Sequence, residues 1–457
     1  MAAPPANHVG AIGVVGLWHL GSVTAACLAD AGYTVIAVDP DEAVVERMAR
    51  GVPPVSEPGL PELLERAAER LRFSSEAGAL ANVERAWVTF DTPVDDDDNA
   101  DVDWVVEHAA RMLAPLASDA LVIVSSQLPV GSVARLQERC ASERGSDDLR
   151  FACIPENLRL GGALDAFRSP ERFVVGARGE RDLAEVSELL APFEAEIESM
   201  RVESAEMTKH ALNGFLATSV AFINEIATIC ESVGADAGEV SRGLKSERRI
   251  GPRAYLAPGD AFAGGTLARD ISFLRDLADR YALPDDVFAG VANGNAAHKG
   301  WAQRKLLSLL AARGGERSER PLAGATIAIW GLTYKPGTDT LRRSSAIELC
   351  RWLCSAGADV RAHDPAVAQL PDDLADAVTL CQTPLAAASG AAALVISTAW
   401  PEYREVAAGA VVDALAQPLV IDAAAFLQAT LGVERRLRYA HVGSADQAVS
   451  TSAEAIS

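Results

Sequence analysis

The chain lacks an excess of positive charge, a long uninterrupted apolar run and any cysteine spacing typical of a zinc site. Among its 457 residues, 41 lysines and arginines face 63 aspartates and glutamates, which gives a formal net charge of −22 at pH 7. Sequence-independent binding to nucleic acid requires a basic face, so we expect no nucleic-acid partner. No run approaches the roughly 18 apolar residues of a membrane span, and the first residues lack the basic and apolar regions of a signal peptide. We therefore expect a cytoplasmic protein with no membrane partner.

The number and spacing of the cysteines argue against disulfides and against a zinc site. An odd number of scattered cysteines in a large chain indicates reduced thiols, and no spacing such as C-x₂-C is present. We therefore expect no metal site. The seven cysteines are at positions 27, 140, 153, 230, 350, 354 and 381.

The first half of the chain alternates apolar, strand-like runs with helix-like segments. Hydrophobic residues make up 49% of the sequence, and the length is too great for a single core, so two or three domains are expected. Strands that alternate with helices imply right-handed crossovers and a doubly wound parallel sheet in an α/β fold. The expected strands are 11–15, 34–38, 86–90, 121–124 and 172–176.

A different pattern begins near residue 200. Helical periodicity runs from 203 to 233, and further helix-like runs reach about residue 312. A polar, breaker-rich linker follows at 311–321. A second α/β alternation then begins, with expected strands at 326–330, 358–362, 393–397 and 419–422.

These patterns predict two Rossmann-like doubly wound parallel-sheet domains joined by a central helical domain. The tail is small and polar, and we expect it to be disordered. The predicted boundaries are 1–199 for the first domain, 200–312 for the helical domain, 322–443 for the third domain and 444–457 for the tail.

The segment Gly16-Leu17-Trp18-His19-Leu20-Gly21 has the setting of a Rossmann dinucleotide fingerprint, because it follows a strand and opens a helix. The glycines permit a tight turn and close helix–strand packing, and the phosphates face the positive end of the helix. Asp39 ends the second strand, where an acid binds the adenosine ribose and favours NAD over NADP. Trp18 replaces the second glycine, and its ring either displaces the cofactor or folds away. A glycine turn that serves only packing is the alternative.

Seven segments form an ordered series of motifs. They are V-S-E-P-G-L at 55–60, F-D-T-P-V-D at 90–95, S-Q-L-P-V-G-S at 126–132, P-E-N-L-R-L-G at 155–161, E-M-T-K-H-A-L-N at 206–213, F-A-G-G-T-L-A-R-D at 262–270 and G-L-T-Y-K-P-G-T-D-T-L-R at 331–342. They resemble E-P-G-L, G-T-P, S-T-V-P-V-G-T, P-E-F-L-R-E-G, E-x-x-K-x-x-x-N, F-G-G-x-C-[FL]-x-K-D and G-L-x-F-K-x-x-T-D-D-x-R of the UDP-glucose/GDP-mannose 6-dehydrogenase family. On this series the chain is identified as a member of that family.

The resemblance implies an NAD-dependent oxidoreductase that acts on a nucleotide sugar and forms a homodimer through the central helical domain. The first domain would bind NAD, and the third would bind the nucleotide sugar. Contacts to the cofactor are then expected from Gly16, Trp18, Gly21, Asp39, Thr92 and Arg342. Contacts to the substrate are expected from Leu158, Arg159, Arg253, Tyr255, Gly264 and Lys335. For Lys335 and Arg342, an ordinary surface charge is the alternative.

The resemblance also assigns catalytic roles. Lys209 and Asn213, four apart on one helical face, would hold a water or the developing alkoxide near C6 of the sugar. Lys209 would also take or stabilise a proton. Asp270 would orient a catalytic water, and Glu156 is an acid/base candidate. The structural alternatives are an ion pair for Lys209 or Glu156 and a helix N-cap for Asp270.

Four positions of the family pattern are lost. The first is the nucleophilic cysteine, whose slot holds Thr266. In the same motif, and apart from these four losses, Arg269 stands in the slot of the lysine. A threonine hydroxyl has a far higher pKa than a thiol and forms no thioester without an adjacent base. Cys153 is the alternative source of a thiol. The other losses are Gln127 for the oxyanion threonine, Leu160 for the second glutamate, and Ala-Ala-Ala at 423–425 for an arginine-containing contact.

These losses concern the second oxidation and hydrolysis. The leading hypothesis is therefore hydride removal from a sugar carbinol, C6 by resemblance, without a covalent thiohemiacetal. The product would be the aldehyde, or the acid after hydration to a gem-diol and a second non-covalent oxidation. The alternatives are an epimerase that returns the hydride to the sugar and a non-catalytic nucleotide-sugar-binding protein.

Overall fold

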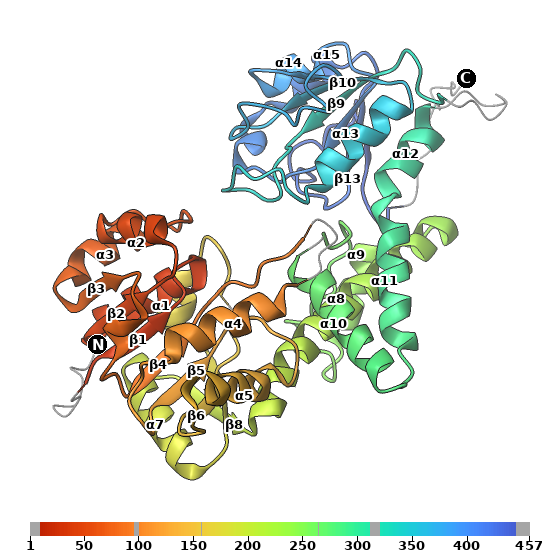
Figure 1. The fold of residues 1–457 in the computed structure, drawn as a ribbon. Helices are drawn as coiled ribbons and strands as arrows, with labels where there is room; N and C mark the ends of the chain where they lie inside the picture. The colour runs from red at the N-terminus through yellow and green to blue at the C-terminus, as the bar shows by residue number, and fades with distance from the viewer. Residues whose placement is uncertain (1–9, 96–99, 157, 264, 311–319, 445–457) are drawn as a thin grey trace, which may run out of the picture. The chain divides into compact units, whose positions relative to one another are not determined.

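The structure is a computed structural model that describes residues 10–95, 100–156, 158–263, 265–310 and 320–444. The chain divides into two compact units, Met1–Leu212 and Asn213–Ser457 (Figure 1), and each is described by itself. Most of the expected linker and nearly all of the expected tail lie outside the described residues. The three-domain division stays a prediction.

Within the described part of the first unit, eight strands form one sheet in the order β3-β2-β1-β4-β5-β6-β7-β8. Neighbouring strands are parallel except β6 and β7, so β7 and β8 run against the other six. The strand order reverses between β1 and β4. In such sheets ligands usually bind beside the carboxyl ends of the two strands at this point. The strands are β1 (Ile12–Val15), β2 (Val35–Val38), β3 (Leu71–Ser74), β4 (Arg85–Val88), β5 (Leu121–Val124), β6 (Arg150–Cys153), β7 (Arg172–Ala177) and β8 (Glu196–Met200).

Helices cover both faces of this sheet, and successive strand residues point to opposite faces. Val14 thus belongs to one buried cluster and Val15 to the other, and Leu121 and Val122 divide in the same way. This explains why the strands read as continuous apolar runs. The helices are α1 (His19–Asp30), α2 (Glu42–Ala49), α3 (Leu60–Ala67), α4 (Val102–Leu113), α5 (Ser132–Arg144), α6 (Ala163–Arg168) and α7 (Glu180–Leu190).

The second unit joins a helical part to a second parallel sheet. The long helix α8 (Val202–Val233) begins in the first unit and ends in the second. The sheet, counted over described residues, has six strands in the order β11-β10-β9-β12-β13-β14, all parallel. The strands are β9 (Thr326–Trp330), β10 (Asp359–His363), β11 (Val378–Leu380), β12 (Ala393–Ile396), β13 (Leu419–Asp422) and β14 (Arg438–Ala440). The helices are α9 (Ala237–Ser246), α10 (Thr266–Arg280), α11 (Asp286–Lys299), α12 (Trp301–Leu310), α13 (Ser345–Ser355), α14 (Pro384–Ala388) and α15 (Ala408–Ala414).

The expected elements agree with the observed ones wherever one was expected, and the strands at 121–124, 326–330 and 419–422 have the predicted bounds. The sequence pattern missed β3, β6, β8, β11 and β14. All are short, and β3, β8, β11 and β14 are partly exposed strands that lack a continuous apolar run.

The expectation that no segment is long and apolar enough to span a membrane needs one correction. By length and composition alone, α8 is long and apolar enough to cross a membrane, with a mean hydropathy of 1.3 in its most apolar window. Of that window, 44% is buried inside the protein. The helix also carries the buried polar residues Lys209, Asn213 and Asn224, so we assign it to packing within the protein.

Candidate active site

A glycine turn connects β1 to α1. Gly16 has a positive φ of 96°, and a Cβ built on it would lie 2.8 Å from the backbone nitrogen of Phe90. A Cβ on Gly21 would lie 1.7 Å from the carbonyl oxygen of Gly16. Neither position can hold a side chain, so both glycines serve the tight turn and close packing of a dinucleotide fingerprint.

Asp39 follows β2 and lies against this turn. Its Oδ2 accepts a hydrogen bond from the N–H of Leu17 at 2.6 Å, and its Oδ1 accepts one from the N–H of Asp41 at 2.9 Å. Burial raises the pKa of the Asp39 carboxyl, although these two hydrogen bonds oppose the rise. The turn and this carboxylate together fit the ribose end of a dinucleotide.

Trp18 and Asp91 depart from the usual arrangement. Trp18 is the N-cap of α1, and its side chain is 47% exposed and makes no capping hydrogen bond. Oδ2 of Asp91 instead accepts a hydrogen bond from the N–H of His19 at 3.1 Å. A carboxylate therefore lies at the positive end of α1, where phosphates bind in dinucleotide folds. The next residue, Thr92, donates from Oγ1 to the carbonyl oxygen of Gln127 at 2.7 Å.

Glu156 and Lys209 line a small cavity in the first unit, together with Ser126 and Gln127. Its volume is about 20 Å³, enough for one water molecule. The Oγ of Ser126 is buried and has no hydrogen-bond partner among the described residues, as expected of a hydroxyl that binds a water. Two of the predicted catalytic residues thus share one cavity of water size.

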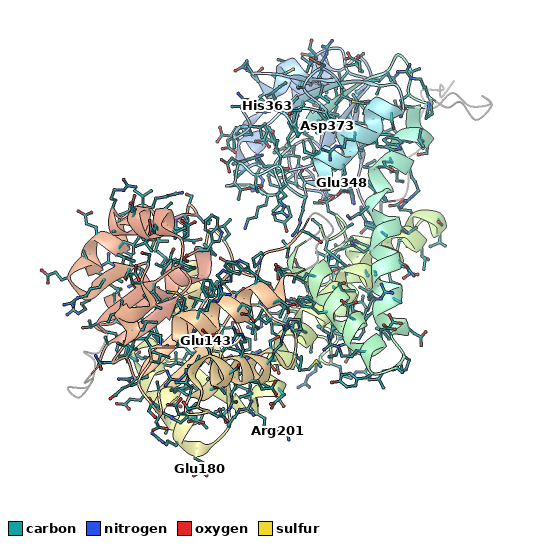
Figure 2. All side chains as sticks on the ribbon, viewed as in Figure 1. Glu143, Glu180, Arg201, Glu348, His363 and Asp373 are labelled. Atoms are coloured by element: carbon teal, nitrogen blue, oxygen red, sulfur yellow. The ribbon has the colours of Figure 1, made fainter. Side chains whose placement is uncertain are left out.

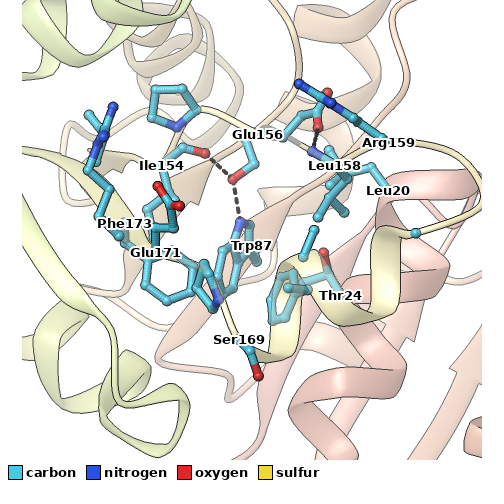
Figure 3. A pocket seen from close by; sticks show the side chains of 18 residues that line it. Leu20, Thr24, Trp87, Ile154, Glu156, Leu158, Arg159, Ser169, Glu171 and Phe173 are labelled. Atoms are coloured by element: carbon cyan, nitrogen blue, oxygen red, sulfur yellow. Dashed lines mark hydrogen bonds between the residues drawn. The ribbon is translucent and has the colours of Figure 1, made fainter. Parts of the chain in front are cut away.

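A larger cavity of about 550 Å³ shares Glu156 with the small one (Figure 3). Its wall is mostly aromatic and aliphatic, and Leu158 and Arg159 line it from the segment after β6. Oε2 of Glu156 accepts a hydrogen bond from the N–H of Leu158 at 2.6 Å. Trp87, which Figure 3 labels on the cavity wall, donates a hydrogen bond from Nε1 to Oγ of Ser125 at 2.7 Å. The predicted substrate contacts Leu158 and Arg159 therefore face a cavity large enough for part of a ligand.

Glu57 fastens the segment after β6 to the start of α1. It accepts hydrogen bonds from the N–H groups of Gly161 and Ala163, both at 2.8 Å, and shares one with Nε2 of His19 at 2.9 Å. Burial opposes its ionisation, but these bonds outweigh burial and lower the pKa of the Glu57 carboxyl. The buried Glu57 is therefore a positioning residue, a role that the E-P-G-L motif by itself does not reveal.

Asn213 and Asp270 meet in the second unit. Nδ2 of Asn213 donates a hydrogen bond to Oδ2 of Asp270, and both side chains are buried. Thr266 is the first residue of α10, and Asp270 lies four positions later on the same helix face. Thr266 is exposed. The second unit thus places three predicted catalytic residues at α8 and the start of α10.

The loop before α10 faces the segment that follows β9. A Cβ built on Gly265 would lie 3.5 Å from the hydroxyl of Tyr334 and 3.8 Å from Nη1 of Arg343. Lys335, a predicted substrate contact, follows Tyr334 and is partly buried. Gly265 and the segment after β9 therefore contribute to one region of this unit.

The remaining predicted contacts are less definite. Arg253, Tyr255 and Arg342 are exposed, and the backbone N–H of Arg342 donates to Oγ1 of Thr340 at 3.3 Å. Gly264 lies outside the described residues.

A cavity of about 270 Å³ lies at the carboxyl ends of β12 and β13. Ser397 and Ala423 line it from these ends, and Lys299 and Glu348 line it from α11 and α13. Figure 2 labels Glu348, whose Oε2 lies 3.7 Å from Nζ of Lys299. The strand order reverses at β9, which pairs with β12, so the cavity lies close to where open α/β sheets bind ligands. Ala423 opens the three-alanine segment that replaces an arginine-containing contact.

The buried Cys153 is a poor source of the missing thiolate. All seven cysteines are free, and five are buried. Burial raises the pKa of the Cys153 thiol far above its usual range, and it raises the pKa of Cys27, Cys140 and Cys350 to about 12. A thiol that stays protonated is a poor nucleophile, so the alternative that Cys153 replaces the lost cysteine has no support.

Three domains of one protein family match successive parts of the chain. Residues 10–194 match the NAD binding domain of the UDP-glucose/GDP-mannose dehydrogenase family, residues 203–297 its central domain and residues 328–429 its UDP binding domain.

Two relatives and one solved structure extend this match over most of the chain. The chain is 34% identical to a UDP-glucose 6-dehydrogenase of Pseudomonas aeruginosa, over 90% of this chain and 92% of that protein. It is 32% identical to the UDP-glucose 6-dehydrogenase TuaD of Bacillus subtilis, over 90% of this chain and 88% of that protein. The structure resembles that of a UDP-glucose dehydrogenase from Pyrobaculum islandicum with a TM-score of 0.83 and 29% identity, covering 97% of this chain and 100% of the other.

Proposed function

Because the chain belongs to the UDP-glucose/GDP-mannose dehydrogenase family, we propose that it oxidises the C6 carbinol of a UDP-linked sugar with NAD and releases the aldehyde, without a covalent bond to the protein. In this reaction the C6–H bond gives its electron pair as hydride to the cofactor. The hydroxyl proton leaves to a base or to water. The relatives named UDP-glucose 6-dehydrogenase support a UDP-hexose as the first substrate to test.

The observation that carries the proposal is the buried Asn213–Asp270 pair beside Thr266. Asp270 and Asn213 supply a carboxylate and an amide that can orient a water or the substrate hydroxyl. Thr266 supplies a hydroxyl whose pKa is too high for a nucleophile, since a carboxylate one turn away is a weak base toward it. The cluster therefore supports polar orientation of the substrate and not covalent capture.

Glu156 and Lys209 supply the proton-handling groups of the first unit. The one-water cavity between them offers a route by which the C6 hydroxyl proton passes to a bound water. Leu160 stands where the family motif has its second glutamate, so one acid of the hydrolytic step is missing. This loss agrees with release of the aldehyde before a second oxidation.

The turn at Gly16 and Gly21 and the carboxylate of Asp39 would hold the adenosine end of NAD. When bound, NAD supplies the hydride acceptor. The cavity at the ends of β12 and β13 would take the uridine diphosphate part of the substrate, with Lys335 as a further contact. Arg342 would reach the cofactor phosphate, as the resemblance implies.

The test is to incubate the purified protein with NAD and a panel of UDP- and GDP-sugars, following NADH by absorbance and the sugar by mass. One NADH per sugar with an aldehyde trapped by hydroxylamine is the expected result. An isomerised sugar without net NADH would replace the proposal with the epimerase alternative. No change with any sugar, despite measurable binding, would remove the dehydrogenase proposal.

A second candidate function is a nucleotide-sugar-binding protein that turns nothing over. The exposed Trp18 and the carboxylate of Asp91 at the start of α1 favour it, since a large ring and a negative charge both oppose binding of the cofactor pyrophosphate. Binding of a UDP-sugar with unchanged affinity in the presence or absence of NAD, and no NADH, would favour this candidate.

We also propose that the protein is a cytoplasmic homodimer that pairs through α8. Phe215, Phe222 and Ile229 recur every seven residues on this helix and are exposed, as is Val233 four residues later. A seven-residue spacing places side chains on one helix face. An exposed apolar stripe of this kind is typical of a subunit interface.

A further inference from the structure

Asp91 occupies the place that a phosphate takes in other dinucleotide folds. Its Oδ2 accepts a hydrogen bond from the N–H of His19, and its carboxylate also interacts with the N–H of Leu20. These are the first two residues of α1, whose N-cap residue Trp18 contributes no capping side chain. The orphan N–H groups of a helix start are the donors that bind pyrophosphate. Here a side chain of the protein already uses two of them.

The position of Asp91 is fixed by its neighbours. Oγ1 of Thr89 donates to the carbonyl oxygen of Gly16 at 2.8 Å, and the ring and backbone of Phe90 pack directly on Gly16. Thr92 is held by its hydrogen bond to the carbonyl of Gln127. The segment therefore cannot place Asp91 far from the turn unless these contacts break. In the G-T-P motif that this segment resembles, the same position is a glycine, which brings no charge.

We propose that Asp91 acts as an internal competitor for the pyrophosphate of NAD, so that the protein binds this cofactor more weakly than its turn and Asp39 would allow. Two like charges within a few ångströms repel, and close to a protein surface the repulsion exceeds the value in bulk water. NAD must then displace the carboxylate or meet it in its protonated form. Asp91 is thus a residue that sets cofactor affinity.

The charges around Asp91 give this competition a pH dependence. Removal from water raises the pKa of its carboxyl to about 6, and Glu156 after β6 adds to the rise. His19 on α1, itself bonded to Glu57, opposes the rise, as do the two N–H groups. The residue as a whole is exposed, so the proton can exchange with solvent, while the carboxyl itself lies against the start of α1. Above about pH 6 the carboxylate repels pyrophosphate, and below this pH the neutral acid does not.

A binding experiment that needs no catalysis tests the inference. The affinities of NAD and of adenosine are measured by calorimetry for the intact protein and for Asp91→Asn and Asp91→Gly, at about pH 8 and about pH 5.5. Adenosine is the matched probe because it lacks the phosphates but uses the same ribose contact. Asp101→Asn is the matched control, since Asp101 caps α4 by a hydrogen bond to the N–H of Trp104.

At about pH 8, both Asp91 variants should bind NAD about tenfold more tightly, or better, while adenosine affinity stays unchanged. The gain should shrink at the lower pH, and Asp101→Asn should match the unchanged protein. Unchanged or weaker NAD binding in both Asp91 variants would overturn the inference, and so would an equal gain for adenosine. Tighter NAD binding by the Asp91 variants, together with no NADH formed by the unchanged protein from any sugar nucleotide, would leave this inference standing and overturn the proposed oxidation.

Discussion

The amide of Asn213 donates a hydrogen bond to the carboxylate of Asp270, and both side chains are buried. The bond joins α8 to α10 within the second unit. An amide donor fixes the orientation of a carboxylate without removing its charge. Asp270 is therefore a pre-oriented acceptor one helical turn from the position where the family motif has a cysteine.

Replacing Asp270 with asparagine should lower kcat about 10²-fold, because an amide cannot orient or accept from water as a carboxylate does. KM for the sugar should change little. Steady-state kinetics with thermal unfolding of both proteins checks this expectation. Asp276→Asn is the matched control, since Asp276 is an exposed aspartate on the same helix and should keep full activity. Equal losses in the two variants would contradict the assignment.

Thr266→Ala should retain activity within about threefold, because the hydroxyl takes no covalent part in the reaction. Thr266→Ser serves as the control that keeps the hydroxyl and changes only the methyl group. The measurement is the initial rate of NADH formation at saturating NAD and sugar. If the alanine variant lost more than about 10²-fold while the serine variant stayed active, Thr266 would be a nucleophile after all.

Glu57→Gln should lower the stability of the first unit at pH 7 by about 1–3 kcal/mol, because it weakens the buried bonds to Gly161, Ala163 and His19. The pKa of Glu57 is lowered in the folded protein, so its contribution is present above the unfolded pKa of about 4.3 and is lost as pH falls through the folded value. The difference in unfolding midpoint between the two proteins should therefore shrink below about pH 4. Glu62→Gln, at an exposed position of α3, should show no difference at any pH. A Glu57→Gln difference that grows on acidification would contradict this assignment.

Phe222→Glu should convert a dimer into a monomer, because it places a charge in the middle of the exposed apolar stripe of α8. Light scattering on a sizing column gives the mass directly. Val433→Glu is the control, since Val433 is an exposed apolar residue of the second unit outside α8. A monomeric unchanged protein, or a Phe222→Glu variant that stays dimeric, would contradict pairing through this face.

The sequence predicts the α/β architecture well because the buried strands are continuous apolar runs. Strands such as β5 and β9 lie between two layers of helices, and burial on both faces leaves little choice of residue. The edge strands β3, β8, β11 and β14 could not be predicted, because they are partly exposed and lack a continuous apolar run. In β8 every residue is exposed or partly exposed, so neither a run nor a clean alternation marks it.

The candidate site could be predicted only in part. Motif spacing identifies Lys209, Asn213 and Asp270, but it does not show that Asn213 bonds to Asp270 or that Lys209 shares a cavity with Glu156. The contact of Asp91 with α1 joins segments more than 70 residues apart, so motif spacing along the chain cannot predict it. The one available signal was an acid in the glycine position of the G-T-P motif.

The most direct measurement is the ratio of NADH formed to sugar nucleotide consumed, taken together with the intact mass of the protein during the first turnovers. We expect one NADH per sugar, an aldehyde that hydroxylamine traps, and a protein mass that does not change. Two NADH with a carboxylate product, or a protein whose mass rises by that of the sugar nucleotide, would contradict it.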